Sequence, residues 1–161
     1  MESMSAAQAV SAIHAMRELY PKLYDLALAI RAFEGWEAPR GKLPYGPLGP
    51  GAPSVRTEGS RSWRNNNPGN LRESIYASDI ADGFACFPHY FVGFFALTMD
   101  LFAKCTGKTR TGLLPTSTLR DLVYAYAPAD ENDAEAYTNF LAQRLEVPDD
   151  TRIDTFIGGG W

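Results

Sequence analysis

Glu34 is the acidic residue whose position most clearly suggests chemistry. It directly follows Phe33 and lies four residues after Ile30, in a segment whose apolar residues recur at spacings of three and four. On an α-helix its side chain would project close to the apolar stripe, where partial burial raises the pKa of a carboxyl group. Such a group can hold a proton near neutral pH and give it to a leaving oxygen. The alternative is an ordinary glutamate at a helix end, exposed or capping a neighbour.

A run rich in amides lies between Arg64 and Arg72, where the sequence reads RNNNPGNLR. Asparagine side chains bond readily to nearby backbone groups and glycine permits positive φ, so the simplest interpretation is a rigid turn that enters a strand. The other interpretation is a binding surface, because amides flanked by two guanidinium groups suit a polyhydroxylated, N-acetylated sugar chain. Without further information the pattern favours the turn.

Tyr126 falls on one predicted helix face together with Leu119 and Leu122. Its ordinary role would be that of a core aromatic residue whose hydroxyl reaches the rim of the core. A functional role would be a hydrogen bond to Glu34 or to a sugar. The acidic residues at 130–133 suit the start of the next helix, because the helix dipole favours negative charge there.

Helices must position these groups, and apolar spacing predicts five of them. Prolines, glycines and capping patterns set their limits. The predicted helices cover 6–20, Pro21 to Phe33 or Glu34, a segment from Pro88 to a stop at Gly107, a segment from a cap at Thr116–Thr118 to Pro128, and a segment from a capping box at Asn132-x-x-Glu135 to Leu145. The third should be a central core helix with one buried face, formed by Val92, Phe95, Ala96, Met99, Phe102 and Ala103.

The remaining chain predicts loops and one small sheet. Residues 39–63 are rich in proline and glycine, which leaves almost no room for a helix, and a long surface loop should continue to Gly69 and border the site. The segment 71–87 predicts a hairpin of two or three strands that turns at Gly83, and residues 158–161 predict a flexible tail. The expected fold is mainly α, with a small β-hairpin in an α+β arrangement.

Composition narrows the function classes. The chain has 161 residues, of which 45% are hydrophobic, and is expected to form one domain over 1–161 that needs no disulfide or metal to fold. Cys86 and Cys105 form neither a disulfide framework nor a zinc pattern. A net charge of −4 without a long basic run argues against nucleic-acid binding. The sequence lacks a secretory signal pattern and any stretch of about 18 apolar residues, so no membrane insertion is expected.

Four segments, in their order along the chain, resemble a known group of proteins. They are FEGW at 33–36, RNNNPGNLR at 64–72, GFACF at 83–87 and YAPADENDAEAY at 126–137. The chain resembles the lysozyme-like superfamily of lytic transglycosylases and goose-type lysozymes, which cleave peptidoglycan and occur often in phages and bacterial genomes. The resemblance covers roughly residues 23–150. The Glu-Ser pair and the Gly-Leu-Met-Gln segment of familiar transglycosylases are absent, so it does not extend to a well-studied branch.

The resemblance implies a lysozyme-like helical domain and a role for each matched residue. Glu34 would end a helix at the bottom of a sugar-binding cleft and act as the general acid. The stretch from Asn67 to Asn70 would shape the wall beside it, and Tyr126 would lie near the acid. The substrate would be the β-1,4 bond between N-acetylmuramic acid and N-acetylglucosamine.

The number of carboxylates at the scissile bond decides the reaction. With Glu34 alone, the sugar's own C6 hydroxyl attacks and a 1,6-anhydro product forms, which is lytic transglycosylation. A second carboxylate about 6.5–9.5 Å away would instead activate water for inverting hydrolysis. Asp79 and Asp82 are the candidates, although both also suit a turn beside Gly83. The single-acid reaction is preferred, and a third reading is an inactive wall-binding or virion structural module.

Residues expected to bind the glycan or to orient the acid complete this prediction. They are Asn67, Asn70 and Tyr126, together with three rings on which sugars could stack: Trp36, Tyr45 and Trp63. Trp63 could equally be an anchor of the loop. The chemistry needs no cofactor or metal. The expected partner is the glycan strand of bacterial peptidoglycan, bound by a monomer that is made in the cytoplasm and reaches the cell wall by phage delivery or holin release.

Overall fold

The computed structural model describes residues 3–36, 59–126 and 133–158. Over these ranges the chain is mainly helical, with one small antiparallel sheet, as the sequence predicts. The elements are α1 (Ala6–Leu19), α2 (Pro21–Phe33), α3 (Arg61–Arg64), β1 (Asp79–Ala81), β2 (Phe84–Cys86), α4 (Tyr90–Cys105), α5 (Leu119–Tyr126), α6 (Ala134–Leu145) and a 3-10 helix, η2 (Ile153–Ile157).

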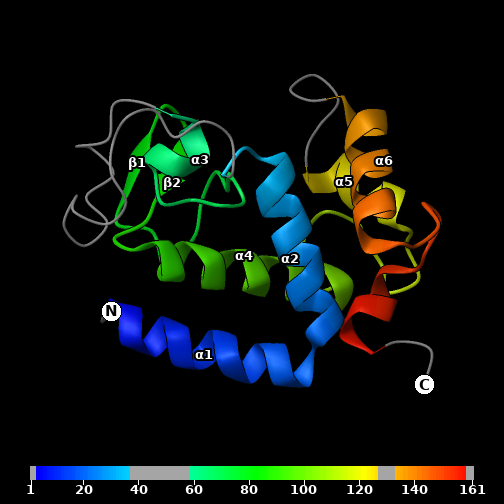
Figure 1. The fold of residues 1–161 in the computed structure, drawn as a ribbon, viewed down its shortest axis with the longest axis horizontal. Helices are drawn as coiled ribbons and strands as arrows, with labels where there is room; N and C mark the ends of the chain where they lie inside the picture. Colours follow the sequence, from blue (N-terminus) through cyan, green and yellow to red (C-terminus); the bar gives the residue numbers. More distant parts are fainter. Residues whose placement is uncertain (1–2, 37–58, 127–132, 159–161) are drawn as a thin grey trace.

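The end of α2 lies between two parts of the molecule. Figure 1 shows α4 running alongside α1, with α2 crossing α4. The C-terminal end of α2 then points into the space between α3 with the hairpin on one side and α6 on the other. Any residue that immediately follows Phe33 can therefore be contacted from both sides.

Helix α4 supplies the centre of the core, as predicted, but its buried surface is wider than one stripe. Val92 and Ala96 are buried as expected, whereas Met99 is 36% exposed. Leu97 and Leu101, outside the predicted stripe, are fully buried in the main cluster between the helices. Burial extends beyond the predicted stripe because α4 is apolar on most sides and packs against two separate clusters, one of which includes Ala9 of α1.

The prediction of a surface loop up to Gly69 was wrong at its described end. Residues 61–64 form α3, whose first turn is capped by Ser60 Oγ accepting a hydrogen bond from Trp63 N at 3.2 Å. Most of the chain from Ser62 to Gly69 is buried. An irregular segment can be buried when its backbone polar groups find partners, and asparagine side chains supply them here. Residues 39–58 of the predicted loop lie outside the described ranges.

Smaller differences concern helix ends. The cap of α6 is Asp133, whose Oδ1 accepts a hydrogen bond from Ala136 N at 3.0 Å, while the predicted cap Asn132 lies outside the described residues. Asp and Asn are equally good caps, so the sequence did not distinguish them. Gly158, predicted as the first residue of a flexible tail, has φ 86° and ends the unpredicted helix η2; residues 159–161 are not described.

The hairpin and the cysteines agree with the sequence analysis. Strands β1 and β2 pair antiparallel, with Asp79 opposite Cys86, and the chain turns through Asp82 and Gly83. Cys86 and Cys105 are free and buried. Within the described ranges, no helix has the length and apolar content of a membrane span, and no three His, Cys, Asp or Glu side chains gather as metal ligands would.

Candidate active site

Glu34 is the residue at which α2 ends. Its amide still donates to Ile30 O at 2.9 Å, so the residue is held by the last helical hydrogen bond. Gly35 then takes φ 92°, a left-handed conformation that suits glycine and turns the chain away from the helix axis. The side chain of Glu34 is half-buried, as the apolar spacing of α2 predicts.

Both carboxylate oxygens of Glu34 accept hydrogen bonds, and the two donors come from opposite sides. Asn70 Nδ2 donates to Oε1 at 3.1 Å from the asparagine-rich turn. Tyr137 Oη donates to Oε2 at 2.6 Å from α6. The carboxylate is therefore fixed by two neutral donors that the sequence places 36 and 103 residues away.

The surroundings raise the pKa of Glu34 above its ordinary value of 4.5. Burial is the largest cause, because it disfavours the charged form. The hydrogen bonds from Tyr137 and Asn70 and the positive charge of Arg61 act in the opposite direction and offset part of the shift. The predicted direction is confirmed, so this side chain keeps its proton to higher pH than an exposed glutamate does.

Tyr137 is a site residue that the sequence analysis did not predict. Its ring stacks on Phe33, with 3.9 Å between ring centroids and 25° between planes, and this packing aims its hydroxyl at Glu34. Burial, and after it the charge of Glu34, raise the pKa of Tyr137 well above 10, so it remains a neutral donor. The available signal was its place at the end of the 126–137 segment, on the buried face of α6 with Leu141.

Tyr126 does not make the hydrogen bond to Glu34 that was considered for it. Its hydroxyl donates instead to the backbone carbonyl of Gly69, inside the asparagine-rich turn. A β-carbon at residue 69 would lie 2.5 Å from this hydroxyl and 2.7 Å from Leu97 Cδ1, so a larger residue there would have to displace one of these side chains. Tyr126 thus holds the turn that carries Asn70, while Tyr137 takes the contact with the acid.

Asn67 is part of the frame of the turn and is fully buried. Its Nδ2 donates to Leu71 O at 2.8 Å and to Ala85 O at 2.9 Å, and its Oδ1 accepts from Leu71 N at 2.9 Å. These hydrogen bonds join the turn to β2 and engage both the nitrogen and the oxygen of the side-chain amide. The prediction that Asn67 binds substrate is therefore wrong for direct contact, because no polar atom of its side chain is available to a ligand.

Asn70 faces the acid, as the sequence analysis expected. It has φ 49°, a left-handed conformation that asparagine tolerates better than most residues, and this turns its amide toward Glu34. Its Oδ1 is buried and has no hydrogen-bond partner among the described residues. Asn70 therefore holds Glu34 with its nitrogen and leaves an acceptor beside the acid.

The tryptophans do not offer the expected stacking surfaces. Trp36 and Trp63 are only 7% and 2% exposed, and their rings pack edge to face at 5.1 Å. Trp36 also packs against Tyr90 at 4.5 Å, so these rings anchor the chain after α2 to α3 and α4. The third predicted ring, Tyr45, lies outside the described residues.

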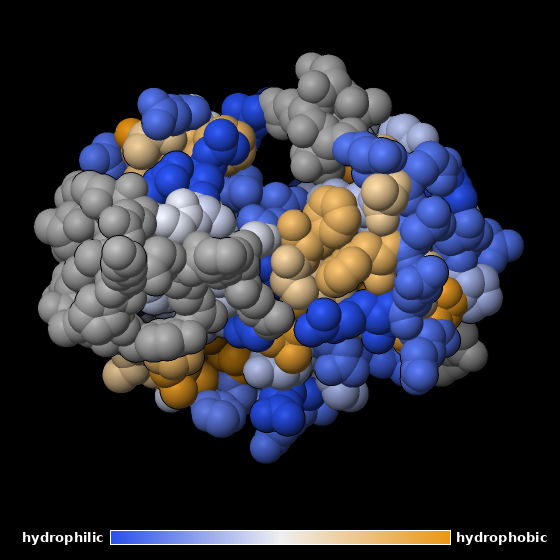
Figure 2. Space-filling model, turned by 45° about the horizontal axis from the view of Figure 1, so that its top comes forward, coloured by the Kyte–Doolittle hydropathy of each residue, from blue (hydrophilic) through white to orange (hydrophobic). Residues whose placement is uncertain are grey.

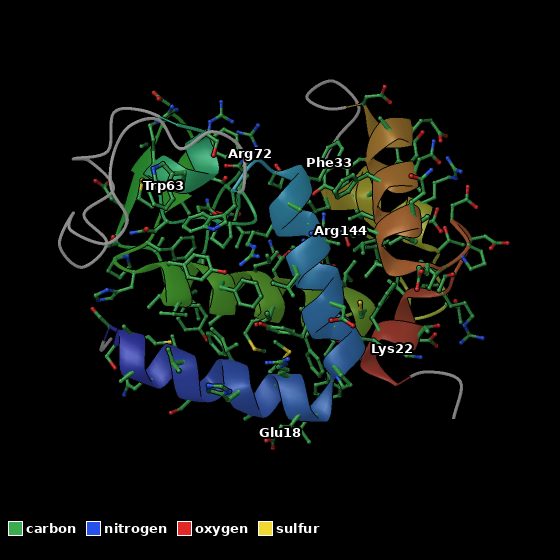
Figure 3. All side chains as sticks on the ribbon, viewed as in Figure 1. Glu18, Lys22, Phe33, Trp63, Arg72 and Arg144 are labelled. Atoms are coloured by element: carbon green, nitrogen blue, oxygen red, sulfur yellow. The ribbon has the colours of Figure 1, made fainter. Side chains whose placement is uncertain are left out.

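Two other rings give the neighbourhood of Glu34 an apolar surface. Phe33 and Phe140 are half-buried, with centroids 5.4 Å apart. Figure 3 shows Phe33 between α2 and α6, and Figure 2 shows apolar surface gathered on the corresponding face, bordered by hydrophilic residues. Neither ring was predicted from the sequence to form part of a binding surface.

Asp79 and Asp82 lie on the exposed hairpin. Asp79 Oδ1 accepts from Ile80 N at 2.8 Å, and Asp82 has φ 52° at the turn, which fits the turn role that was the alternative for both. Among the described residues, the charge of Arg61 lowers the pKa of Glu34, whereas the charge of Asp79 raises the pKa of Cys86 and not that of Glu34. The site as described is built on a single carboxyl group.

Comparisons with known proteins give no further assignment. A scan against protein-family models found no match, and searches of curated proteins and of solved structures found none either.

Proposed function

We propose that this protein is a lysozyme-like peptidoglycan-cleaving enzyme, most simply a lytic transglycosylase acting on the β-1,4 bond between N-acetylmuramic acid and N-acetylglucosamine. The observation that carries the proposal is Glu34: a half-buried carboxyl group of raised pKa, held on both oxygens by neutral donors. The order of the four motif segments along the chain supports it.

The reaction begins with the protonated form of Glu34. The carboxyl group gives its proton to the glycosidic oxygen as the bond from that oxygen to C1 breaks, so the leaving sugar departs as a neutral alcohol. The resulting carboxylate then takes the proton of the C6 hydroxyl, whose oxygen attacks C1. A 1,6-anhydro ring forms, and Glu34 is again protonated.

The hydrogen bonds to Glu34 suit both steps. Burial raises its pKa, which favours the proton donor of the first step. Asn70 and Tyr137 stabilise the carboxylate that the second step needs, and neither requires a change of its own charge to do so. The group therefore alternates between acid and base without a second catalytic carboxylate.

The remaining contacts fit a sugar ligand. The rings of Phe33 and Phe140 provide an apolar face beside the acid on which a pyranose ring can stack. Inverting hydrolysis is less well supported, because Asp79 and Asp82 are exposed on the hairpin.

The test is the release of soluble fragments from purified peptidoglycan by the wild type and by Glu34→Gln. We expect at least a roughly hundredfold loss in the variant, the scale of removing a general acid. Glu18→Gln is the matched control, because Glu18 is exposed on α1 (Figure 3), and it should keep full activity.

Mass spectrometry of the products separates the two reactions, since anhydro ends indicate transglycosylation and reducing ends indicate hydrolysis. Equal activity of the wild type and Glu34→Gln would remove Glu34 from the mechanism. A wild-type protein that binds peptidoglycan without cleaving it would instead support the alternative of an inactive wall-binding or virion structural module.

A further inference from the structure

Asn70 differs from Asn67, its neighbour in the turn, in how its side-chain amide is held. The amide of Asn67 is locked in one orientation, because Nδ2 donates to Leu71 O and Ala85 O while Oδ1 accepts from Leu71 N. Among the described residues, the amide of Asn70 has one hydrogen bond, from Nδ2 to Glu34 Oε1 at 3.1 Å. Its Oδ1 is buried and bonds to no described group. The orientation of the Asn70 amide is therefore set by its contact with Glu34.

A half-turn about the Cβ–Cγ bond of Asn70 would exchange the positions of Nδ2 and Oδ1. The two atoms are nearly equal in size, so the exchange needs almost no additional space. In the present orientation a donor faces Glu34 Oε1, which suits a carboxylate, because a carboxylate only accepts hydrogen bonds. In the turned orientation an acceptor would face Oε1, which suits a carboxyl group with its proton on that oxygen. The half-turn breaks no other hydrogen bond of this amide to the described residues.

The second partner of Glu34 favours Oε1 as the oxygen that carries the proton. Tyr137 Oη donates to Oε2 at 2.6 Å, and within the described ranges this hydroxyl has no other acceptor. A proton on Oε2 would force the hydroxyl to turn its own hydrogen away, which leaves a buried donor unpaired. A proton on Oε1 leaves the bond from Tyr137 intact. It then pairs with the oxygen of the turned amide, which is a stronger acceptor than a phenol oxygen.

We propose that Asn70 is a positioning residue whose amide turns with the protonation of Glu34: Nδ2 donates to the carboxylate, and Oδ1 accepts from the carboxyl group. This inference rests on the proposed function, because a group that acts as both acid and base needs a partner for each form. In the first step the proton leaves Oε1 for the glycosidic oxygen, and the amide turns so that Nδ2 donates to the new carboxylate. In the second step the proton of the C6 hydroxyl returns to Oε1, and the amide turns back.

The other groups around Glu34 keep their charge while Glu34 titrates. Tyr137 from α6 and Tyr126 from α5 each have a pKa well above 10, chiefly because they are buried. Arg61 from α3 supplies the positive charge that acts on Glu34, and an arginine stays charged in proteins. Of the described groups that interact with Glu34, none therefore changes charge together with it. The signal that turns the amide of Asn70 is the proton of Glu34 itself.

Neutron diffraction tests the proposal directly, because deuterium distinguishes Nδ2 from Oδ1. Crystals of the wild type without ligand are exchanged into heavy water and measured at one acidity below the midpoint of Glu34 and one above it. Asn67 in the same crystals is the matched control, because hydrogen bonds to both atoms of its amide fix its orientation. We expect Nδ2 of Asn70 to face Oε1 above the midpoint, and Oδ1 to face a deuteron on Oε1 below it.

Three results would overturn the proposal. The first is the same orientation of the Asn70 amide at both acidities. The second is a deuteron on Oε2 below the midpoint, with the hydroxyl of Tyr137 turned away from Glu34. The third is a turn of both the Asn67 and the Asn70 amides, since the turn would then not depend on contact with Glu34.

A titration of Glu34 by carbon-13 NMR is the second test, in solution. Asn70→Gly removes the amide, and glycine accepts the φ of 49° at this position. Loss of a fixed donor of ordinary strength would raise the midpoint by about 0.7 pH units, because such a donor favours only the carboxylate. A partner of both forms has a smaller effect, so we expect a rise of less than about 0.4 pH units. A larger rise would overturn the proposal.

Neither experiment depends on bond cleavage, so the two proposals are judged separately. If the amide turns but the wild type releases no fragments from peptidoglycan, the proposed catalysis fails and the pairing of Asn70 with Glu34 stands. If the wild type cleaves peptidoglycan and the amide of Asn70 keeps one orientation, only this inference fails.

Discussion

The two walls that hold Glu34 are built in different ways. On the α6 wall, Tyr137 reaches Glu34 because its ring stacks on Phe33 between two helices. On the opposite wall, Asn70 reaches Glu34 because the backbone of its turn is fixed by the buried amide of Asn67. One donor is positioned by packing of side chains, and the other by backbone hydrogen bonds in an irregular segment.

This difference predicts how each wall responds to change. Side-chain packing tolerates replacements that keep shape and volume. A buried turn fixed by the fully bonded amide of Asn67 has no such latitude, because a lost partner leaves a backbone group unsatisfied and a small shift moves the whole segment. Substitutions in the asparagine-rich turn should therefore cost more stability than substitutions on the α6 wall.

The largest effect is expected at the contact between the turn and α4. A β-carbon on Gly93 would lie 1.9 Å from the carbonyl oxygen of Asn66, so Gly93→Ala must displace the turn or the helix. We expect a loss of at least about 3 kcal/mol in the free energy of unfolding, measured by urea denaturation. Gly112→Ala is the control: its φ of 82° is unfavourable for alanine, but no atom lies within 4 Å, and about 1 kcal/mol is expected. Similar losses in both variants would contradict this account of the turn.

A somewhat smaller loss is expected for Asn67→Asp. The substitution places carboxylate oxygens where Nδ2 donates to the carbonyls of Leu71 and Ala85, so an ionised aspartate would be buried against two acceptors. About 2–3 kcal/mol should be lost at neutral pH. The loss should shrink at acid pH, because the protonated aspartate is neutral and can donate to one carbonyl. The exposed Asn139→Asp should change stability by no more than about 0.5 kcal/mol, and an equal effect at both positions would refute the framing role of Asn67.

The smallest effect on stability, and the clearest effect on pH dependence, is expected for Tyr137→Phe. Its hydrogen bond favours the ionised form of Glu34 and so lowers the pKa of that group; removing it raises the pKa. The alkaline limb of a pH–activity profile should shift to higher pH. About 1–2 kcal/mol of stability should be lost above the pKa of Glu34, and less below it, where the carboxyl is neutral.

Tyr126→Phe provides the comparison, because that hydroxyl donates to the carbonyl of Gly69 and not to Glu34. It should lower stability to a similar degree at every pH and leave the alkaline limb in place. A shifted limb in Tyr126→Phe and an unchanged limb in Tyr137→Phe would reverse the roles assigned to the two tyrosines.

The parts of the site that the sequence predicts are those set by short-range spacing. The end of α2 at Phe33, the half-burial of Glu34 and the turn around Asn70 follow from apolar periodicity, Gly35 and asparagine chemistry. Which tyrosine reaches the acid was not predictable in this way, because it depends on how α5 and α6 pack against α2.

Long-range pairing also explains the burial that sequence reasoning missed. Trp36 and Trp63 were predicted as rings on which sugars could stack, yet they pack on each other because α3 folds back toward the end of α2. The chain around Asn67 is polar, which predicts that it lies on the surface. It is buried because strand β2 lies beside it and the carbonyl of Ala85 accepts a hydrogen bond from the Asn67 amide. Both outcomes depend on partners more than a dozen residues away.

The measurement that tests the central claim most directly is a titration of the Glu34 carboxyl group by carbon-13 NMR, with the signal assigned by its absence from Glu34→Gln. We predict a midpoint above 4.5, the ordinary value for glutamate, because burial outweighs the two hydrogen bonds and the charge of Arg61. A midpoint at or below 4.5 would contradict it, since the group would then behave as an ordinary stabilised carboxylate and not as an acid.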